Sequence, residues 1–104
     1  MALGAISRNG VGIRLTDERW AHIVEQHCEL AGMRQDVLEA VASCDRVVAG
    51  NAGELLAVKT VERGKALVVV YRERDEQDGF VITAFVTKRM RGLDRRAQTW
   101  PPQP

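Results

Sequence analysis

The hydrophobic positions predict helices in the first half of the chain and strands in the second. After Thr16 the apolar residues Trp20, Ile23 and Val24 recur at helical spacing, and His27 falls on the same face of the helix. Thr16 is a favourable N-cap residue, and the acidic residues that follow it suit the positive end of a helix. Gly32 ends or interrupts this unit, and a second amphipathic helix is predicted over residues 33–43.

After residue 45 the pattern changes to short extended segments separated by polar turns. Strands are predicted over residues 46–49, 54–61, 66–72 and 80–87. Their short connections require antiparallel pairing. The two helices would cover one face of this sheet. The predicted fold class is therefore α+β, with two N-terminal helices packed on a four-stranded antiparallel β-sheet.

Strict alternation in the last predicted strand divides its side chains between two faces. One face would carry Phe80, Ile82, Ala84 and Val86, and the other would carry Val81, Thr83, Phe85 and Thr87.

The 104 residues fit a single domain. Residues 1–12 are rich in small residues and are predicted to form a flexible leader, residues 13–100 the domain, and residues 101–104 a tail. The longest apolar run, residues 66–71, is too short to span a bilayer, and the leader lacks the apolar stretch of a secretion signal. We therefore expect a cytoplasmic protein without a membrane partner. Cys28 and Cys44 match neither a metal-binding spacing nor a disulfide framework, and whether they pair stays open.

Charge is distributed unevenly, although the net charge is only +1. The segment from Lys88 to the C-terminus has five basic residues and one acidic residue, so it carries +4 and the remainder carries −3. Such a segment suits contact with phosphates, and it equally suits a solvated, loosely ordered terminus.

Two histidines are the candidate acid–base groups. His22 and His27 lie five residues apart in the predicted helix, so they point about 140° apart and do not form an i, i+4 metal pair. Together with a histidine, Arg72, Thr83, Thr87 and Lys88 would suit metal-free cleavage of RNA if they shared one hollow on the sheet face near the first helix. The alternatives are a packed or solvated histidine, surface cations, and a threonine that serves as an ordinary strand former.

A resemblance to a known family favours the chemical interpretation. The stretch from Arg19 to Glu29 resembles an R-x-x-H-I-x-x-x-H-x-E helix, and similar segments follow at residues 37–41, 46–48, 67–72 and 80–85. This order is similar to the phage- and toxin-associated nuclease domains grouped with barnase, EndoU, the colicin tRNases and RelE (the BECR group). The resemblance covers roughly residues 13–88 and implies a RelE/barnase-like fold.

The resemblance implies a metal-independent, toxin-like endoribonuclease without a cofactor. The expected catalytic residues are His22, His27, Arg72 and Thr83, and the expected substrate-binding residues are Tyr71, Lys88 and Arg89. RNA would be the substrate, and an antitoxin or immunity protein a possible partner.

The alternative is a non-catalytic protein-interaction domain with the same fold. The enzyme hypothesis requires a histidine ring within about 7 Å of Arg72 or Thr83, in a place open to solvent. An interaction domain would instead show dispersed polar residues and an exposed apolar patch.

Overall fold

The helices of the first half form where the sequence predicts them. In the computed structural model, which describes residues 3–102, α1 (Asp17–Gln26) begins after Thr16. The Thr16 side chain accepts a hydrogen bond from the Arg19 backbone N–H at 3.1 Å, as expected of an N-cap. A short 3-10 helix, η1 (Cys28–Leu30), leads into α2 (Arg34–Ser43). Both predicted helices are confirmed.

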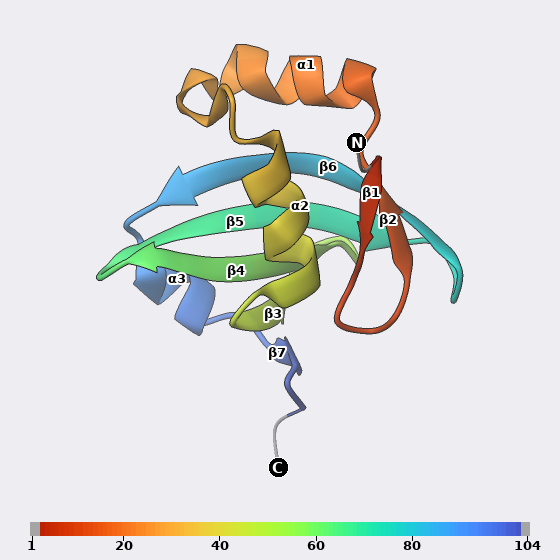
Figure 1. Cartoon of the computed structure of the whole chain (residues 1–104). Coiled ribbons are helices and arrows are strands. Elements are labelled where there is room, and N and C mark those ends of the chain that lie inside the picture. Colours follow the sequence, from red (N-terminus) through yellow and green to blue (C-terminus); the bar gives the residue numbers. More distant parts are fainter. Residues whose placement is uncertain (1–2, 103–104) are drawn as a thin grey trace.

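Seven strands form one curled sheet (Figure 1). They are β1 (Gly4–Ile6), β2 (Gly12–Arg14), β3 (Arg46–Ala49), β4 (Leu55–Glu62), β5 (Lys65–Glu73), β6 (Asp78–Thr87) and β7 (Gln98–Trp100). Their order is β1-β2-β6-β5-β4-β3-β7. The sheet is mixed, because β2 runs parallel to β6 while the other neighbouring strands are antiparallel.

The predicted fold class is wrong. The four predicted strands exist as β3 to β6 and pair in the predicted antiparallel order. However, β1 and β2 extend the sheet on one side and β7 extends it on the other, and a third helix, α3 (Met90–Asp94), follows β6. The sheet therefore has seven mixed strands and not four antiparallel ones. The three added strands have three residues each, too few to show a periodic pattern.

Much of the predicted leader belongs to this sheet. Residues 4–6 pair with residues 12–14 as a hairpin, and residues 12–14 pair in turn with β6. The described part of residues 1–12 is therefore an edge of the sheet, and Met1 and Ala2 lie outside the described residues. Of the predicted tail, residues 101–104, the structure describes only Pro101 and Pro102, because residues 103 and 104 lie outside the described residues.

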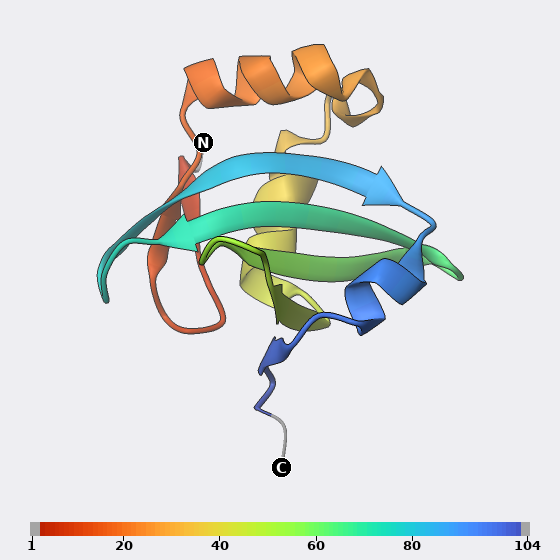
Figure 2. The ribbon, with the colours of Figure 1, turned by 180° about the vertical axis from the view of Figure 1, so that it is seen from behind.

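The sheet separates two hydrophobic clusters. The larger one lies on the α2 side and contains Ile13, Ile23, Val41, Val69 and Tyr71 among its buried members. In both views, α1 runs along the outer side of β6 while α2 crosses the sheet (Figures 1 and 2). The smaller cluster lies on the opposite side, where α3 packs with Met90 and Leu93. Because α3 has only five residues, it covers part of this side (Figure 2).

Candidate functional site

The side of the sheet opposite α2 presents a surface of mixed chemistry. Alternation along β5 and β6 places Ala66 and Thr87 there, together with six side chains that we call the open face: Val68, Val70, Arg72, Phe80, Thr83 and Phe85. Val68 is fully buried and belongs to the small cluster, while the other five are half-buried. The open face is therefore accessible, and it combines a cation, a hydroxyl group and two aromatic rings.

A β-bulge brings both phenylalanines to this face. Val70 lies opposite Thr83, but the next residue, Tyr71, lies opposite Val81, so Ile82 is an additional residue in β6. The alternation reverses at such a bulge. Phe80 consequently shares a face with Phe85, and the predicted division of this strand is corrected. Val81 accordingly lies in the main core, where it is 2% exposed.

Thr83 lies in the middle of the open face with an unused hydroxyl group. Its Oγ1 atom is buried and has no hydrogen-bond partner among the residues that the structure describes. Buried polar atoms are nearly always paired, so an unpaired one calls for an explanation. Because the Oγ1 atom is shielded from solvent, a ligand oxygen could bond it only after the surrounding side chains move.

Arg72 lies toward the loop between β3 and β4. Its guanidinium group donates a hydrogen bond to the Ala52 carbonyl oxygen at 3.0 Å. The Ala52 backbone N–H lowers the pKa of Glu54 most strongly, and the charges of Arg72 and Arg96 lower it further. The hydrogen bond to Ala52 uses one of the five N–H donors of the Arg72 guanidinium group and holds the side chain in place.

His27 lies at the C-terminal end of α1, on the helix stripe that the sequence predicts. Its side chain is 32% exposed, and its Nδ1 atom lies 3.6 Å from a Glu29 carboxylate oxygen. The centroids of the His27 and Phe85 rings are 6.3 Å apart. Since Thr83 is two residues from Phe85 on the same face, the structure brings His27 to the border of the open face.

His22 lies elsewhere. Its side chain is 57% exposed, and its Nδ1 atom lies 3.8 Å from a Glu25 carboxylate oxygen. It lines a shallow surface hollow together with Thr16, Glu18 and Arg19. The structure therefore does not place the two histidines in one site.

The proposed partners His27 and Arg72 also lie apart along the sheet. Phe85, beside His27, is opposite Val68, which is four residues from Arg72 in β5. This separation corresponds to about 13 Å along an extended strand. Moreover, Arg72 reaches toward Ala52, away from α1. These two groups therefore cannot contact the same phosphate in this arrangement.

Tyr71 is inaccessible from the open face. It is 0% exposed, lies in the main core, and its hydroxyl group has no hydrogen-bond partner within residues 3–102. Burial raises the pKa of this hydroxyl group, and the nearby Glu73 charge adds to that effect. A direct contact between Tyr71 and a substrate is therefore incompatible with this structure.

The remaining candidates lie after β6. Lys88 and Arg89 are exposed, and the Arg89 backbone N–H donates to the Thr87 hydroxyl oxygen at 3.0 Å. The basic segment that follows is ordered. An Arg46–Asp94 ion pair of 2.7 Å holds α3, and Arg96 donates to the Ala49 carbonyl oxygen at 3.1 Å.

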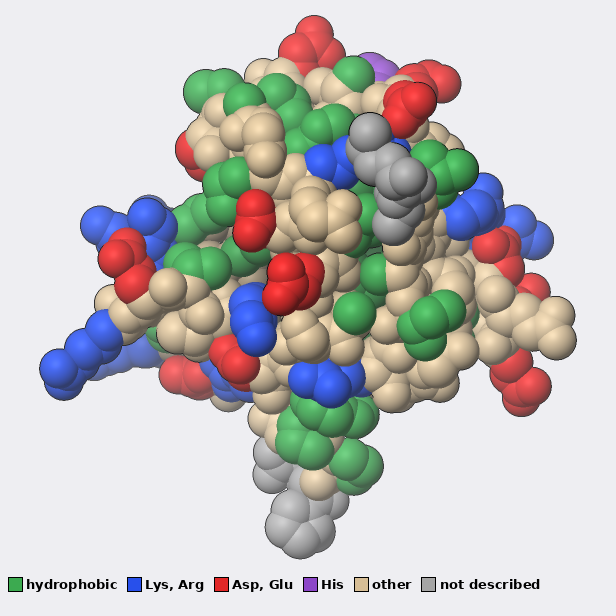
Figure 3. All heavy atoms as spheres, in the orientation of Figure 1, with side chains coloured by type: hydrophobic (Ala, Val, Ile, Leu, Met, Phe, Trp, Pro, Cys, Tyr) green, Lys and Arg blue, Asp and Glu red, His purple; other side chains and the backbone are tan. Residues whose placement is uncertain are grey.

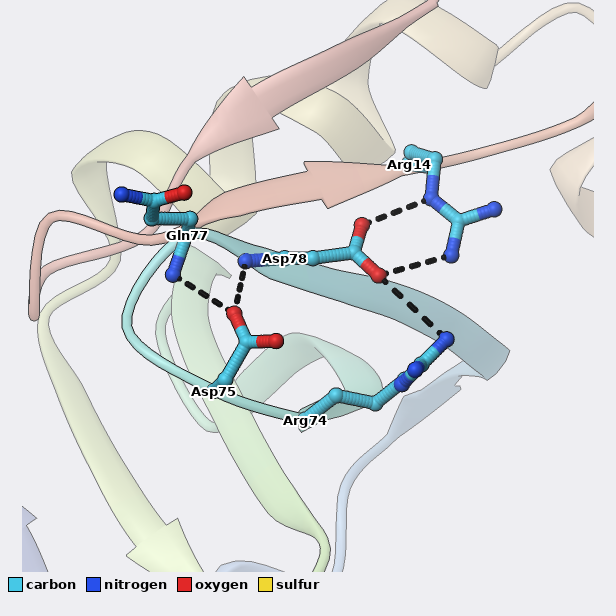
Figure 4. A network of polar contacts seen from close by, with 5 residues as sticks. All are labelled: Arg14, Arg74, Asp75, Gln77 and Asp78. Carbon is cyan, nitrogen blue, oxygen red and sulfur yellow. Dashed lines mark hydrogen bonds and ion pairs between the residues drawn. The ribbon is translucent and has the colours of Figure 1, made fainter.

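A polar network borders the Phe80 end of the open face (Figure 4). Arg14 lies beside Phe80 in the parallel β2–β6 register, and its guanidinium group binds both Asp78 carboxylate oxygens, at 2.9 and 3.1 Å. Arg74 approaches the same carboxylate at 3.6 Å. The hydrogen bond from Arg14 is the main reason why the pKa of Asp78 is lowered.

Sequence reasoning missed Phe80 and Arg14 as site residues. The two phenylalanines are the only ones in the chain, which is a usable signal. In a regular strand, residues five positions apart point to opposite faces, so the sequence predicts that Phe80 and Phe85 lie on opposite sides of the sheet. The bulge that brings them to one side leaves no signal in the sequence.

Within residues 3–102, no helix is long and apolar enough to cross a bilayer, and no three His, Cys, Asp or Glu side chains are grouped so that they could hold a metal ion. No family model, curated protein or solved structure matches the chain.

Proposed function

We propose that this protein is a metal-independent endoribonuclease that cleaves RNA bound across the open face. The observation that carries the proposal is the position of His27 at the border of a face with an unpaired Thr83 hydroxyl group and a fixed arginine, Arg72. An imidazole, a hydroxyl and cationic groups are what metal-free transesterification requires.

In the proposed reaction His27 removes the proton from a ribose 2′-hydroxyl group. The 2′-oxygen then forms a bond to the adjacent phosphorus, and the bond from phosphorus to the 5′-oxygen breaks. The departing 5′-oxygen takes a proton from water, and the hydroxide left behind takes the proton from the His27 imidazolium, which restores both the water and the base. The products are a 2′,3′-cyclic phosphate and a 5′-hydroxyl end, so no oxidant, reductant or additional reactant is needed.

The other side chains have supporting roles in this proposal. The Thr83 hydroxyl group, once the side chains that shield it move, donates to an oxygen of the reacting phosphate. Lys88 and Arg89 follow Phe85 by three and four residues and supply positive charge near His27. Arg72, about 13 Å farther along the sheet, holds a neighbouring phosphate. A toxin-like enzyme of this kind would be inhibited by an antitoxin or immunity protein that covers the open face.

One observation favours the alternative, a non-catalytic interaction domain. Leu3 and Ile6 are 69% and 61% exposed, and they line a shallow groove at the β1 edge of the sheet. Exposed apolar residues on an edge strand are typical of protein contacts. The groove extends to Arg14 and Asp78 at the Phe80 end of the open face, but Leu3 and Ile6 are not part of that face, so variants of these two residues test the alternative separately.

The test is cleavage of end-labelled RNA in EDTA by the wild-type protein, His27→Gln and His22→Gln. We expect the wild type to produce 2′,3′-cyclic phosphate ends. Loss of an acid–base group typically lowers the rate by about 10²- to 10⁴-fold, so His27→Gln should lose activity by this factor. His22→Gln, on the same helix but outside the site, should retain it. Full activity of His27→Gln, or an inactive wild type, would refute the proposal and favour the interaction domain.

A further inference from the structure

Phe80 is a half-buried aromatic residue that packs against neither hydrophobic cluster within residues 3–102. In the sheet it lies between two arginines, because Arg72 is opposite it in β5 and Arg14 is beside it in β2. Neighbouring strands are only about 5 Å apart. The Phe80 ring is thus flanked by an arginine on each side, Arg14 and Arg72, and it belongs to neither hydrophobic cluster.

The two flanking arginines differ in how much of their charge is available. Both Arg14 contacts are to the Asp78 carboxylate, which neutralises it. Arg72 uses one donor on an uncharged carbonyl oxygen, that of Ala52. Within the described residues Arg72 forms no ion pair with a carboxylate, although its charge acts on nearby Glu54, so it is the less neutralised of the two arginines beside the Phe80 ring.

Phe85 provides a second ring on the same face. It is half-buried, borders the small cluster and lies against His27. Phe80 lies opposite Arg72 and Phe85 lies opposite Val68, four residues away in β5. The two rings are therefore separated by about 13 Å along the strand. Successive bases in a nucleic-acid helix are stacked about 3.4 Å apart, so adjacent bases of a duplex cannot rest on both rings.

From this arrangement we infer that the substrate of the open face is single-stranded RNA, whose unstacked bases lie on Phe80 and Phe85. The inference rests on the proposed ribonuclease function and names its substrate class. Aromatic side chains on a sheet can stack with any base, and arginine beside them binds the backbone phosphates. The bulge at Ile82 is the structural feature that makes the two-ring surface possible, since it turns Phe80 to the side of Phe85.

The test uses a fluorescent eight-nucleotide 2′-O-methyl RNA, which has no free 2′-hydroxyl group and cannot undergo the proposed cleavage. Its affinity is measured by anisotropy, alone and annealed to its complement, for the wild type, Phe80→Ala and Val61→Ala. Val61 is a matched control because it is apolar and 49% exposed, at the far end of β4. Thermal unfolding checks that each variant is folded.

We expect the wild type to bind the single strand more tightly than the duplex. Loss of one stacking residue corresponds to about 5- to 150-fold weaker binding, so Phe80→Ala should show a loss of this size while Val61→Ala binds normally. Equal affinity for single strand and duplex, or a folded Phe80→Ala with unchanged affinity, would overturn the inference. Should Phe80→Ala fail to fold, Phe80→Leu replaces it, with the same expected direction.

Parallel cleavage of unmodified single-stranded and duplex RNA separates the two proposals. Cleavage of both forms at equal rates by the wild type and Phe80→Ala would retain the ribonuclease and refute single-strand recognition. Single-strand binding that depends on Phe80, without any cleavage, would refute the ribonuclease and retain the binding surface. A wild type that neither binds nor cleaves would refute both.

Discussion

The direction in which each side chain points decides which candidate residues a substrate can reach. Tyr71 and Arg72 are consecutive in β5, yet one faces the main core and the other the open face. Successive strand residues point to opposite sides, so these two were never able to serve the same substrate directly. The same reasoning applies on α1, where His27 shares the inner stripe and His22 does not.

The buried hydroxyl group of Tyr71 leads to a stability prediction. It is unpaired within the described part of the chain, and an unsatisfied buried polar group typically costs about 1–3 kcal/mol. We expect Tyr71→Phe to raise the free energy of unfolding by about 1 kcal/mol or more, measured by urea denaturation, and to leave RNA cleavage unchanged. A clearly lower stability would mean that the hydroxyl group has a partner in solution.

At the scale of elements, the local sequence pattern predicts the long helices and strands but not the three-residue strands. α1, α2 and the strands β3 to β6 follow from hydrophobic periodicity and turn residues. The β1 and β2 strands have small or glycine residues and exist through pairing with each other and with β6, more than 60 residues away. The bulge in β6 was equally hidden, because nothing in the local alternation distinguishes Ile82 from a regular strand residue.

The junction between β2 and β6 depends on Gly79. This residue pairs with both Ile13 and Glu73, and a Cβ atom there would collide with the Arg72 carbonyl oxygen and lie 2.6 Å from Ile13 Cδ1. Such overpacking typically costs about 1–3 kcal/mol, so we expect Gly79→Ala to lower the free energy of unfolding by that amount.

Gly12→Ala is the matched control for this prediction. A Cβ on Gly12, in the neighbouring strand, would lie 3.5 Å from the Gln77 carbonyl oxygen, which is an ordinary contact. Urea denaturation of both variants compares the two positions. Equal stability of Gly79→Ala and Gly12→Ala would show that the β2–β6 junction is looser than the structure indicates.

The whole molecule combines a small net charge with local differences between its two sides. Figure 3 shows acidic and basic side chains interspersed on the side of α2, with no broad surface of one sign. On the other side, Arg72 lies opposite Phe80 in the sheet, and the exposed Lys88 and Arg89 directly follow the end of β6, which lies two residues beyond Phe85. The net charge of +1 therefore says little about RNA binding, which depends instead on where the basic side chains lie on the surface.

The most direct measurement is an NMR titration of the ¹⁵N-labelled protein with single-stranded 2′-O-methyl RNA. We expect the largest shifts at the backbone amides of Val70, Thr83 and Phe85, with little change at His22 on the outer side of α1. Shifts confined to α1, or to Leu3 and Ile6 at the β1 edge, would contradict the assignment of the open face as the RNA-binding surface.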